Sequence, residues 1–153
     1  MPPTFIHGNM WDDEDCADLF LVTTNATLNK QGHLVMGRGA ALEMTKRFPL
    51  FARTAGACLK SSNLVGGVYG VRTIYPVART TYGIFQVKYH WADDADIRLI
   101  AYSCAHLLAL TATTTYTRIV LNFPGIGHGR LSRATVLPWL LPLPSHVYIY
   151  EKG

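Results

Sequence analysis

The chain has 153 residues, of which 49% are hydrophobic and 16% are charged. An apolar, charge-poor chain of this length collapses around one core, so the composition excludes a disordered protein and predicts a single domain over residues 1–153. Lys and Arg number 14 against 10 Asp and Glu, and this net charge of +4 suits an anionic partner but lacks the basic runs typical of duplex binders.

The cysteine pattern and the apolar runs bear on metal sites and membranes. Cys16, Cys58 and Cys104 stand at wide spacings with no CxxC or His/Cys pattern beside them, so we expect free buried thiols and no metal. The N-terminal residues lack the basic start and apolar stretch of a signal peptide, and no apolar run approaches the roughly 20 residues of a membrane span. The sequence therefore predicts a cytoplasmic protein with no membrane association and no cofactor.

The first part of the chain predicts two strands and a helix. Residues 4–8 form a short mixed strand, and the acidic stretch 12–15 after them predicts a turn. Residues 19–23 are a continuous apolar and β-branched run, typical of a strand that is buried on both faces of a parallel sheet. Residues 40–48 combine good helix formers with helical apolar spacing, and Pro49 is expected to end that helix.

The middle of the chain predicts two strands and the clearest helix. Residues 65–74 and 82–87 have strand character, and Gly83 is taken to mark a turn. Residues 93–110 have a helical apolar period over their whole length. Acidic residues are favoured at the start of a helix, and this position explains Asp93, Asp94 and Asp96 without a metal site or a catalytic role.

The last third continues the alternation of strands and helices. Residues 118–123 predict a buried strand, 124–130 a glycine-rich loop, and 146–150 a final strand. Ser132 is a good N-cap for a short helix before that strand. This alternation predicts an α/β fold class with three α/β/α layers around a mixed, mostly parallel sheet.

Two glycine-rich loops carry the strongest functional signal. The first is residues 36–41, MGRGAA, and the second is residues 124–131, PGIGHGRL; each follows a predicted strand and precedes a predicted helix. Ligands of open α/β sheets bind at the carboxyl ends of the strands. Glycines let main-chain N–H groups approach phosphate oxygens, and the following helix N-terminus favours negative charge. Neither loop contains the GK[ST] of a P-loop.

In this order along the chain, four segments resemble the macrodomain family. They are GNMW at 8–11, VTTN at 22–25, VMGRGAAL at 35–42 and PGIGHG at 124–129. The MGxGxA form of the first loop is similar to the branch that includes lysine-dependent ADP-ribosyl glycohydrolases. The resemblance implies a macrodomain-like fold that binds ADP-ribose or a related NAD-derived small molecule.

The resemblance also implies a role for each segment. Asn9 and Met10 would face the adenine, Asn25 and residues 37–40 the distal ribose, and residues 125–131 the diphosphate. Family members often carry Asp at the position of Asn9, whose amide oxygen can accept from the same adenine amino group. The expected ligand-binding residues are Asn9, Met10, Asn25, Met36, Gly37, Arg38, Gly39, Ala40, Gly125, Ile126, Gly127, His128, Gly129, Arg130 and Leu131.

Two residues are candidates for catalysis. Lys88 stands where the resembled branch places a lysine that attacks C1″ of the distal ribose, a role that needs a lowered pKa. The same branch uses an acidic residue just after its second loop, but residues 129–133 contain no carboxylate. His128 is a candidate proton carrier in that loop, with a structural or ribose-contacting role as the alternative.

Four functions therefore stay open on the sequence alone. The first is a hydrolase that removes ADP-ribose from protein or nucleic acid, with Lys88 as nucleophile. The second is a binding module for ADP-ribose without chemistry, and the third is a phosphatase acting on ADP-ribose 1″-phosphate, which needs only a positioned water. The fourth is single-stranded nucleic-acid binding, for which Tyr89 and Trp91 beside Lys88 are the aromatic residues best placed.

Overall fold

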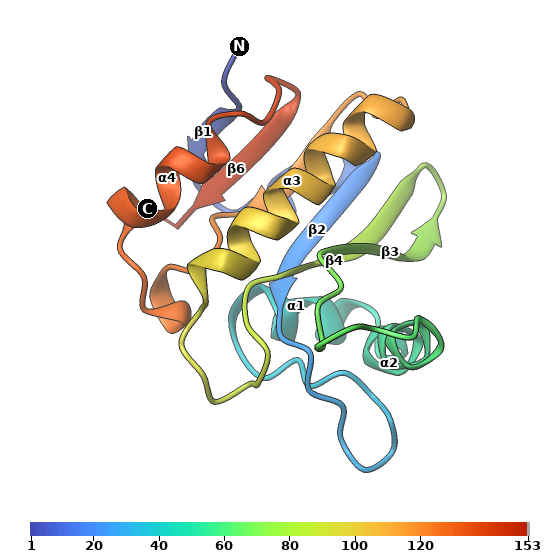
Figure 1. Ribbon diagram of the computed structural model, residues 1–153. Helices are drawn as coiled ribbons and strands as arrows, with labels where there is room; N and C mark the ends of the chain where they lie inside the picture. The colour runs from blue at the N-terminus through green and yellow to red at the C-terminus, as the bar shows by residue number, and fades with distance from the viewer. Residues whose placement is uncertain (153) are drawn as a thin grey trace.

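The computed structural model describes residues 1–152 and contains a six-stranded sheet between two layers of helices (Figure 1). The strands are β1 (Thr4–His7), β2 (Leu19–Thr24), β3 (Val71–Val77), β4 (Thr80–Gln86), β5 (Ile119–Asn122) and β6 (Val147–Glu151). The helices are α1 (Gly39–Arg47), α2 (Phe51–Ser61), α3 (Ile97–Thr113) and α4 (Arg133–Leu140), with 3-10 turns η1 (Met10–Cys16) and η2 (Gly127–Gly129). The predicted three-layer α/β class is confirmed.

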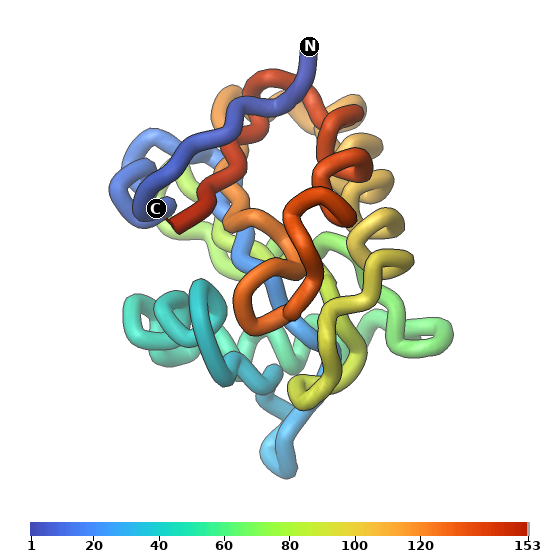
Figure 2. Tube along the Cα trace, turned by 90° about the vertical axis from the view of Figure 1, so that its left-hand side faces the viewer, coloured from blue at the N-terminus to red at the C-terminus, as the bar shows by residue number. Residues whose placement is uncertain are grey.

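The strand order is β1-β6-β5-β2-β4-β3, and only the pair β3–β4 is antiparallel. The mixed, mostly parallel sheet predicted from the sequence is therefore confirmed. Helices α1 and α2 cover one face and α3 and α4 the other, and in Figure 2 the cyan α1 and α2 lie on the opposite side from α3. Because the parallel strands run the same way, their carboxyl ends meet at one edge of the sheet.

Strand β2 shows why the apolar run 19–23 forms the centre of the sheet. Phe20 and Val22 point into the core under α1 and α2, whereas Leu19 and Leu21 point into the core under α3 and α4, and all four are fully buried. Successive side chains of a strand alternate between faces, so only a continuous apolar run satisfies a strand that is covered on both sides.

The acidic stretch 12–15 is not the predicted turn but part of η1, and Asp13 within it is buried, with 6% of its surface exposed. Its carboxylate accepts hydrogen bonds from Arg118 Nε and Nη2 at 2.7–2.9 Å and from Tyr150 Oη at 2.7 Å. A buried carboxylate needs such partners. The ion pair fixes η1 against β5 and β6, and through η1 it fixes the segment that enters the site.

Two more predictions need correction around the edge strands. The strand predicted over 65–74 begins only at Val71, because residues 65–70 form a loop in which Gly66, Gly67 and Gly70 have positive φ angles. Gly83 lies inside β4 and is not a turn residue; an added Cβ there would lie 2.5 Å from the carbonyl oxygen of Arg72. A glycine at this position lets neighbouring chain approach the strand closely.

Helix α2 is absent from the predicted elements, although Phe51, Ala55 and Leu59 are buried at a four-residue spacing. Helix α3 confirms the helix predicted over 93–110, but it begins at Ile97 with Asp96 as its N-cap. The preceding residues therefore belong to a loop. No helix in the described part of the chain is long and apolar enough to cross a membrane.

The cysteines correct one expectation. All three are free, as predicted, but only Cys104 is buried; Cys16 is exposed and Cys58 is half-buried.

Candidate functional site

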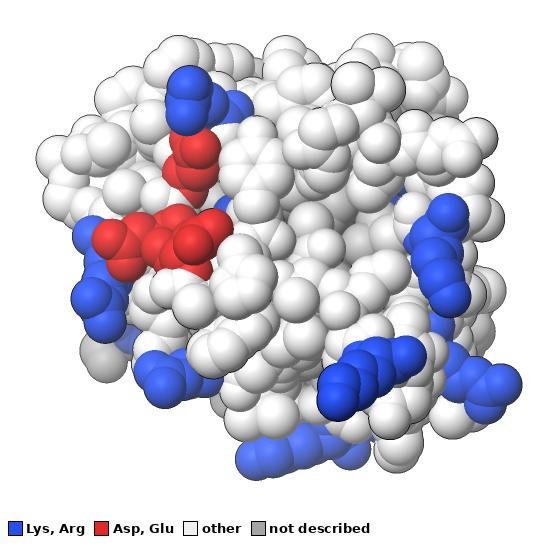
Figure 3. Space-filling view, turned by 60° about the horizontal axis from the view of Figure 1, so that its bottom comes forward, with Lys and Arg blue, Asp and Glu red and all other residues white. Residues whose placement is uncertain are grey.

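A cavity of about 850 Å³ opens at the carboxyl ends of the parallel strands. This volume is within the range of small-molecule sites. Figure 3 looks at this edge of the molecule, which is hollowed in its middle, with acidic side chains gathered on one side and basic side chains on several others. The walls come from the segments that follow β1, β2, β4, β5 and β6 and from the start of α1.

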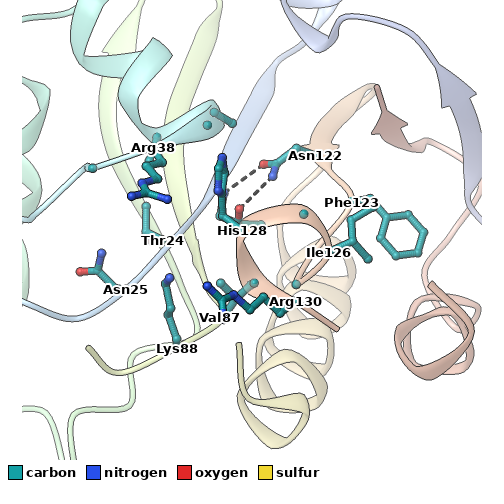
Figure 4. Close-up of a pocket in the computed structure, with 18 of the residues that line it drawn as sticks. Thr24, Asn25, Arg38, Val87, Lys88, Asn122, Phe123, Ile126, His128 and Arg130 are labelled. Carbon is teal, nitrogen blue, oxygen red and sulfur yellow. Dashed lines mark hydrogen bonds between the residues drawn. The ribbon is translucent and has the colours of Figure 1, made fainter. Parts of the chain in front are cut away.

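The floor of the cavity lies where β2 and β5 diverge. Their parallel pairing ends at Leu21 and Leu121, and beyond it the side chain of Asn122 bridges the two strands. Its Oδ1 accepts from the N–H of Thr23 at 3.0 Å, and its Nδ2 donates to Thr23 Oγ1 at 2.8 Å (Figure 4). A side chain thus takes over the backbone hydrogen bonds that the ladder gives up, and the gap between the strands becomes the floor.

The second glycine-rich loop is held against α3. Gly125 has a φ of 80°, and an added Cβ there would lie 2.6 Å from Ile100 Cδ1. Within the described residues 1–152, the N–H groups of Ile126, Gly127 and His128 make no hydrogen bond. Free amides in a glycine-rich turn form a concave anion-binding surface.

The first glycine-rich loop lies across the cavity from the second. Helix α1 begins at Gly39, and its N-cap residue Arg38 makes no capping hydrogen bond with its side chain. The first N–H groups of α1 are therefore left to a ligand, and the helix dipole favours an anion there. His128 of the second loop faces this start, with its Cδ2 3.9 Å from where a Cβ on Gly39 would be, and Figure 4 shows Arg38 and His128 on neighbouring walls.

One end of the cavity is formed by Asn9 and Met10. The Asn9 Oδ1 accepts from the N–H of Trp11 at 3.0 Å and caps η1, while its Nδ2 makes no hydrogen bond among the described residues. Met10 is 5% exposed. The amide of Asn9 therefore both holds the turn and keeps a free donor at the wall of the cavity.

Asn25 is fixed by its neighbours on all sides. Its Nδ2 donates to the carbonyl of Val35 at 2.9 Å, and its Oδ1 accepts from the N–H of Thr27 at 2.8 Å. Its carbonyl accepts from Tyr69 Oη at 2.7 Å, and the same hydroxyl contacts Thr24 Oγ1. The side chain predicted to face a ribose thus also ties the loop before α1 to the end of β2.

Lys88 follows β4 and lines the opposite end of the cavity. Its Nζ donates to the carbonyl oxygens of Trp91 and Asp93, both at 3.1 Å. A neutral amine has two N–H groups and one lone pair, so two carbonyl acceptors leave the lone pair directed away from both. The contacts hold the amine in an orientation suited to nucleophilic attack.

The charges around Lys88 shift its pKa. Partial burial lowers the pKa of the ammonium, and the nearby Arg38 and Arg130 lower it further. The carboxylates of Asp93 and Asp94 oppose this shift. Figure 4 shows Lys88 beside Arg130 at the wall of the cavity. The net direction raises the share of free amine near neutral pH.

No protein-family model matches the chain, and no curated protein matches it in sequence. Among solved structures, the macrodomain of Thermus aquaticus DarG has a TM-score of 0.72 at 23% identity, over 97% of both chains. The macrodomain of Mycobacterium tuberculosis DarG has a TM-score of 0.76 at 20% identity, over 98% of this chain and 97% of that one. The protein has the macrodomain fold.

A third neighbour, Thermosipho africanus DarTG in complex with ADP-ribose, has a TM-score of 0.75 at 20% identity. The likeness covers 95% of this chain and 40% of that one. At these identities the likeness concerns the fold.

The fold brings most of the predicted site residues to one cavity. Met36 and Leu131 are not on the cavity wall: Met36 is buried in the core under α1 and α2, and Leu131 packs against the core under α3 and α4. The predicted residues that line the cavity are Asn9, Met10, Asn25, Gly37, Arg38, Gly39, Ala40, Lys88, Gly125, Ile126, Gly127, His128, Gly129 and Arg130.

Several residues line the cavity that the sequence patterns did not indicate. Asn122, Tyr150 and Glu151 lie at the ends of β5 and β6, where the rule for parallel sheets places ligand contacts. The sequence assigns Asp93 and Asp94 to the start of a helix. In the structure α3 begins only at Ile97, so both aspartates belong to the loop before it and lie on the cavity wall. The position of ligand sites at the carboxyl ends of parallel strands predicts the residues at the ends of β5 and β6. The two aspartates could not be predicted in this way, because their place depends on the path of a loop.

Proposed function

We propose that this protein binds ADP-ribose, or a closely related NAD-derived nucleotide, in the cavity. The observation that carries the proposal is the pair of opposed glycine-rich loops with unengaged N–H groups, which form a cradle for two linked phosphates. The bound ADP-ribose of the Thermosipho africanus DarTG structure supports this choice of ligand.

The cavity offers a site for each part of such a ligand. Asn9 and Met10 suit the adenine, since Asn9 has a free amide donor and Met10 an apolar surface. The amides of residues 126–128 suit the diphosphate, and the end of the cavity near Lys88 suits the distal ribose. In this orientation C1″ of the distal ribose lies on the Lys88 side.

We propose further that the protein hydrolyses the bond between ADP-ribose and a protein side chain or a nucleic-acid base. Lys88 supports this proposal, because its two carbonyl contacts orient the amine toward the cavity. Replacement of Lys88 by Met should abolish release of ADP-ribose while leaving ADP-ribose binding within about threefold of wild type. Reductive trapping of a covalent adduct on Lys88 in the wild type, and none in the variant, would support a lysine-linked intermediate.

The alternative is a module that binds ADP-ribose without chemistry. The lack of a carboxylate in residues 129–133 favours this alternative, because the second loop then offers no carboxylic acid for a leaving group. An ADP-ribosylated substrate that is bound but stays intact in the presence of the wild type would favour it over the hydrolase.

Calorimetric titration with ADP-ribose tests the binding proposal. Gly127→Glu and Gly66→Glu form a matched pair, because Gly127 has a φ of 65° and Gly66 a φ of 64°, and neither has an atom within 4 Å of an added Cβ. Only Gly127 of the two lines the cavity described above.

We expect the wild type and Gly66→Glu to bind in the micromolar range. Gly127→Glu should lose at least about 100-fold in affinity, because its carboxylate meets the diphosphate. Equal binding by all three proteins, or no binding to the wild type, would contradict the proposal.

A further inference from the structure

The hydrolysis proposed above needs a proton for the group that leaves C1″, and the second loop has no carboxylate to supply it. Carboxylates from other segments do reach the cavity. They belong to Glu43, Asp93, Asp94 and Glu151. Their positions and partners decide which of them can serve the reacting end.

Two of these carboxylates belong to the opposite end of the cavity from Lys88. Glu151 Oε1 accepts from Arg133 Nε at 2.8 Å, and its carbonyl accepts from the N–H of Gly8, next to the adenine end. Glu43 Oε1 lies 3.7 Å from Lys152 Nζ, on the residue that follows Glu151. Neither carboxylate is free and near Lys88.

The two aspartates lie at the reacting end. The main chain of Asp93 contacts Lys88 directly, since its carbonyl oxygen accepts from Lys88 Nζ at 3.1 Å. Asp94 Oδ1 lies 3.7 Å from Arg130 Nε of the second loop. Asp93 Oδ2 accepts from the N–H of His90 at 3.3 Å, and its Oδ1 makes no hydrogen bond among the described residues. Asp93 is therefore the aspartate whose main chain contacts Lys88 directly, and one of its carboxylate oxygens is free, whereas the Asp94 carboxylate faces Arg130.

The loop that carries Asp93 is fixed in place by its backbone. The N–H of Trp91 donates to Thr27 Oγ1 at 3.0 Å, and the carbonyl of Tyr89 accepts from the N–H of Ala26 at 2.9 Å. These bonds join residues 89–91 to the segment after β2. Lys88 Nζ also donates to the carbonyl oxygens of Trp91 and Asp93, which fixes the same loop on its other side. A group that transfers protons needs such a fixed position relative to the reacting atoms.

We propose that Asp93 is the catalytic acid and base of this site, an inference that rests on the hydrolysis proposed above. Its carboxylate takes a proton from the Lys88 ammonium through one intervening water. The amine then forms a bond to C1″ while the bond from C1″ to the leaving group breaks, and the protonated Asp93 donates its proton to the leaving group. This leaves ADP-ribose on Lys88 and the carboxylate of Asp93 ionised.

The second half of the reaction restores both residues. Water adds to C1″ and gives one proton to Asp93, and the bond between C1″ and Lys88 Nζ breaks. The amine takes up the proton from Asp93, which returns Lys88 to the ammonium and Asp93 to the carboxylate. The sum is one water consumed, one ADP-ribose released and one protonated leaving group.

Asp93→Asn is compared with Asp15→Asn, because Asp15 is an exposed aspartate outside the cavity whose carboxylate makes no ion pair among the described residues. Release of ADP-ribose is measured in single turnovers from a single-stranded DNA oligonucleotide carrying ADP-ribose on a base and from a peptide carrying ADP-ribosyl glutamate. Asp93→Asn should slow the faster of these reactions at least about 100-fold, the contribution of a general acid, while ADP-ribose affinity stays within about threefold of wild type. Asp15→Asn should change the rate less than about fivefold.

A chemical rescue separates proton transfer from a structural effect. Asp93→Ala should regain at least about tenfold in rate when formate is added, because formate supplies a mobile carboxylate at the vacated position. Asp15→Ala should not respond. Wild-type rates in Asp93→Asn, or a slow Asp93→Ala without rescue, would overturn the role of Asp93 and leave the hydrolysis intact. If the wild type released ADP-ribose from neither substrate, both the proposed hydrolysis and this role of Asp93 would be wrong. The calorimetric titration with ADP-ribose tests binding independently of this result.

Discussion

Gly125 in the second loop and Gly37 in the first have opposite surroundings. A Cβ added to Gly125 would lie 2.6 Å from Ile100 Cδ1 and 3.1 Å from Leu131 Cδ1, whereas one added to Gly37 would have no atom within 4 Å. Gly125 also has a φ of 80°, and Gly37 is not among the glycines with positive φ. One glycine is required for the loop to fold against α3, and the other leaves space that a ligand can occupy.

Glycines in a glycine-rich motif therefore serve two different requirements, close packing and open space for a ligand, and the sequence alone does not show which glycine serves which. The second loop is part of the core under α3 and presents its amides from a fixed backbone. The first loop opens a path to the start of α1. Substitutions should therefore separate the two loops into effects on stability and effects on binding.

The largest expected effect is on binding, at Gly37. In Gly37→Glu the new carboxylate occupies the open side of the first loop and repels the diphosphate, so ADP-ribose affinity should fall on the order of 1000-fold, or about 4 kcal/mol. Denaturant unfolding should stay within about 0.5 kcal/mol of wild type. If the Gly37→Glu variant folds and its affinity for ADP-ribose is unchanged, the ligand does not lie against the first glycine-rich loop.

The next effect is on stability, at Gly125. Gly125→Ala combines a close contact with a left-handed backbone, and we expect a loss of about 3 kcal/mol in the free energy of unfolding. Gly127→Ala is the matched control, since its φ is 65° and its Cβ would meet nothing within 4 Å. The control should lose only about 1 kcal/mol. Equal losses in urea unfolding would mean that backbone strain alone, and not packing on α3, sets the cost.

A smaller effect is expected at the floor between the loops. Asn122→Leu removes the acceptor of the Thr23 N–H and leaves a donor without its partner, which should cost about 2 kcal/mol in unfolding free energy. ADP-ribose affinity should fall less than about tenfold, because the floor is displaced without losing a contact to phosphate. A loss of affinity as large as that of Gly37→Glu would assign Asn122 a direct contact with the ligand.

The smallest effect concerns a region remote from both loops. His106 Nδ1 accepts from the N–H of Val71 at 3.1 Å, and burial, together with the charge of Arg72, lowers the pKa of this histidine. A folded pKa below the unfolded value of about 6.5 means that the unfolded chain binds the proton more readily. The stability from neutral His106 is thus complete above about pH 6.5 and is lost as the pH falls through the folded pKa.

Urea unfolding of the wild type and of His106→Asn at about pH 7.5 and about pH 5 measures this contribution. The stability of the wild type should fall more between the two conditions than that of the variant. ADP-ribose affinity at about pH 7.5 should be the same in both proteins. An identical pH dependence in the two proteins would remove His106 as a source of it.

The elements that local patterns define were predicted best. The apolar run of β2, the body of α3 and the two glycine-rich loops all follow from neighbouring residues in the sequence, whereas α3 starts four residues later than predicted, at Ile97. The site edge followed from them, because parallel strands share their carboxyl ends. Lys88 reached the cavity for the same reason, at the end of β4.

The features that were missed depend on distant partners or on the path of a loop. Asp13 is buried only because Arg118, 105 residues away, pairs with it. Asp93 lines the cavity because Thr27 and Lys88 hold the loop between β4 and α3, and the acidic composition there is equally typical of a helix start. The spacing of neighbouring residues therefore does not show that Asp13 is buried or that Asp93 lines the cavity.

A crystal structure of the protein with bound ADP-ribose would locate each part of the nucleotide in the cavity. We expect the diphosphate on the amides of residues 126–128 and at the start of α1, the adenine beside Asn9 and Met10, and C1″ on the Lys88 side. A nucleotide bound outside the cavity, or one with its adenine beside Lys88, would contradict the assignment of the site.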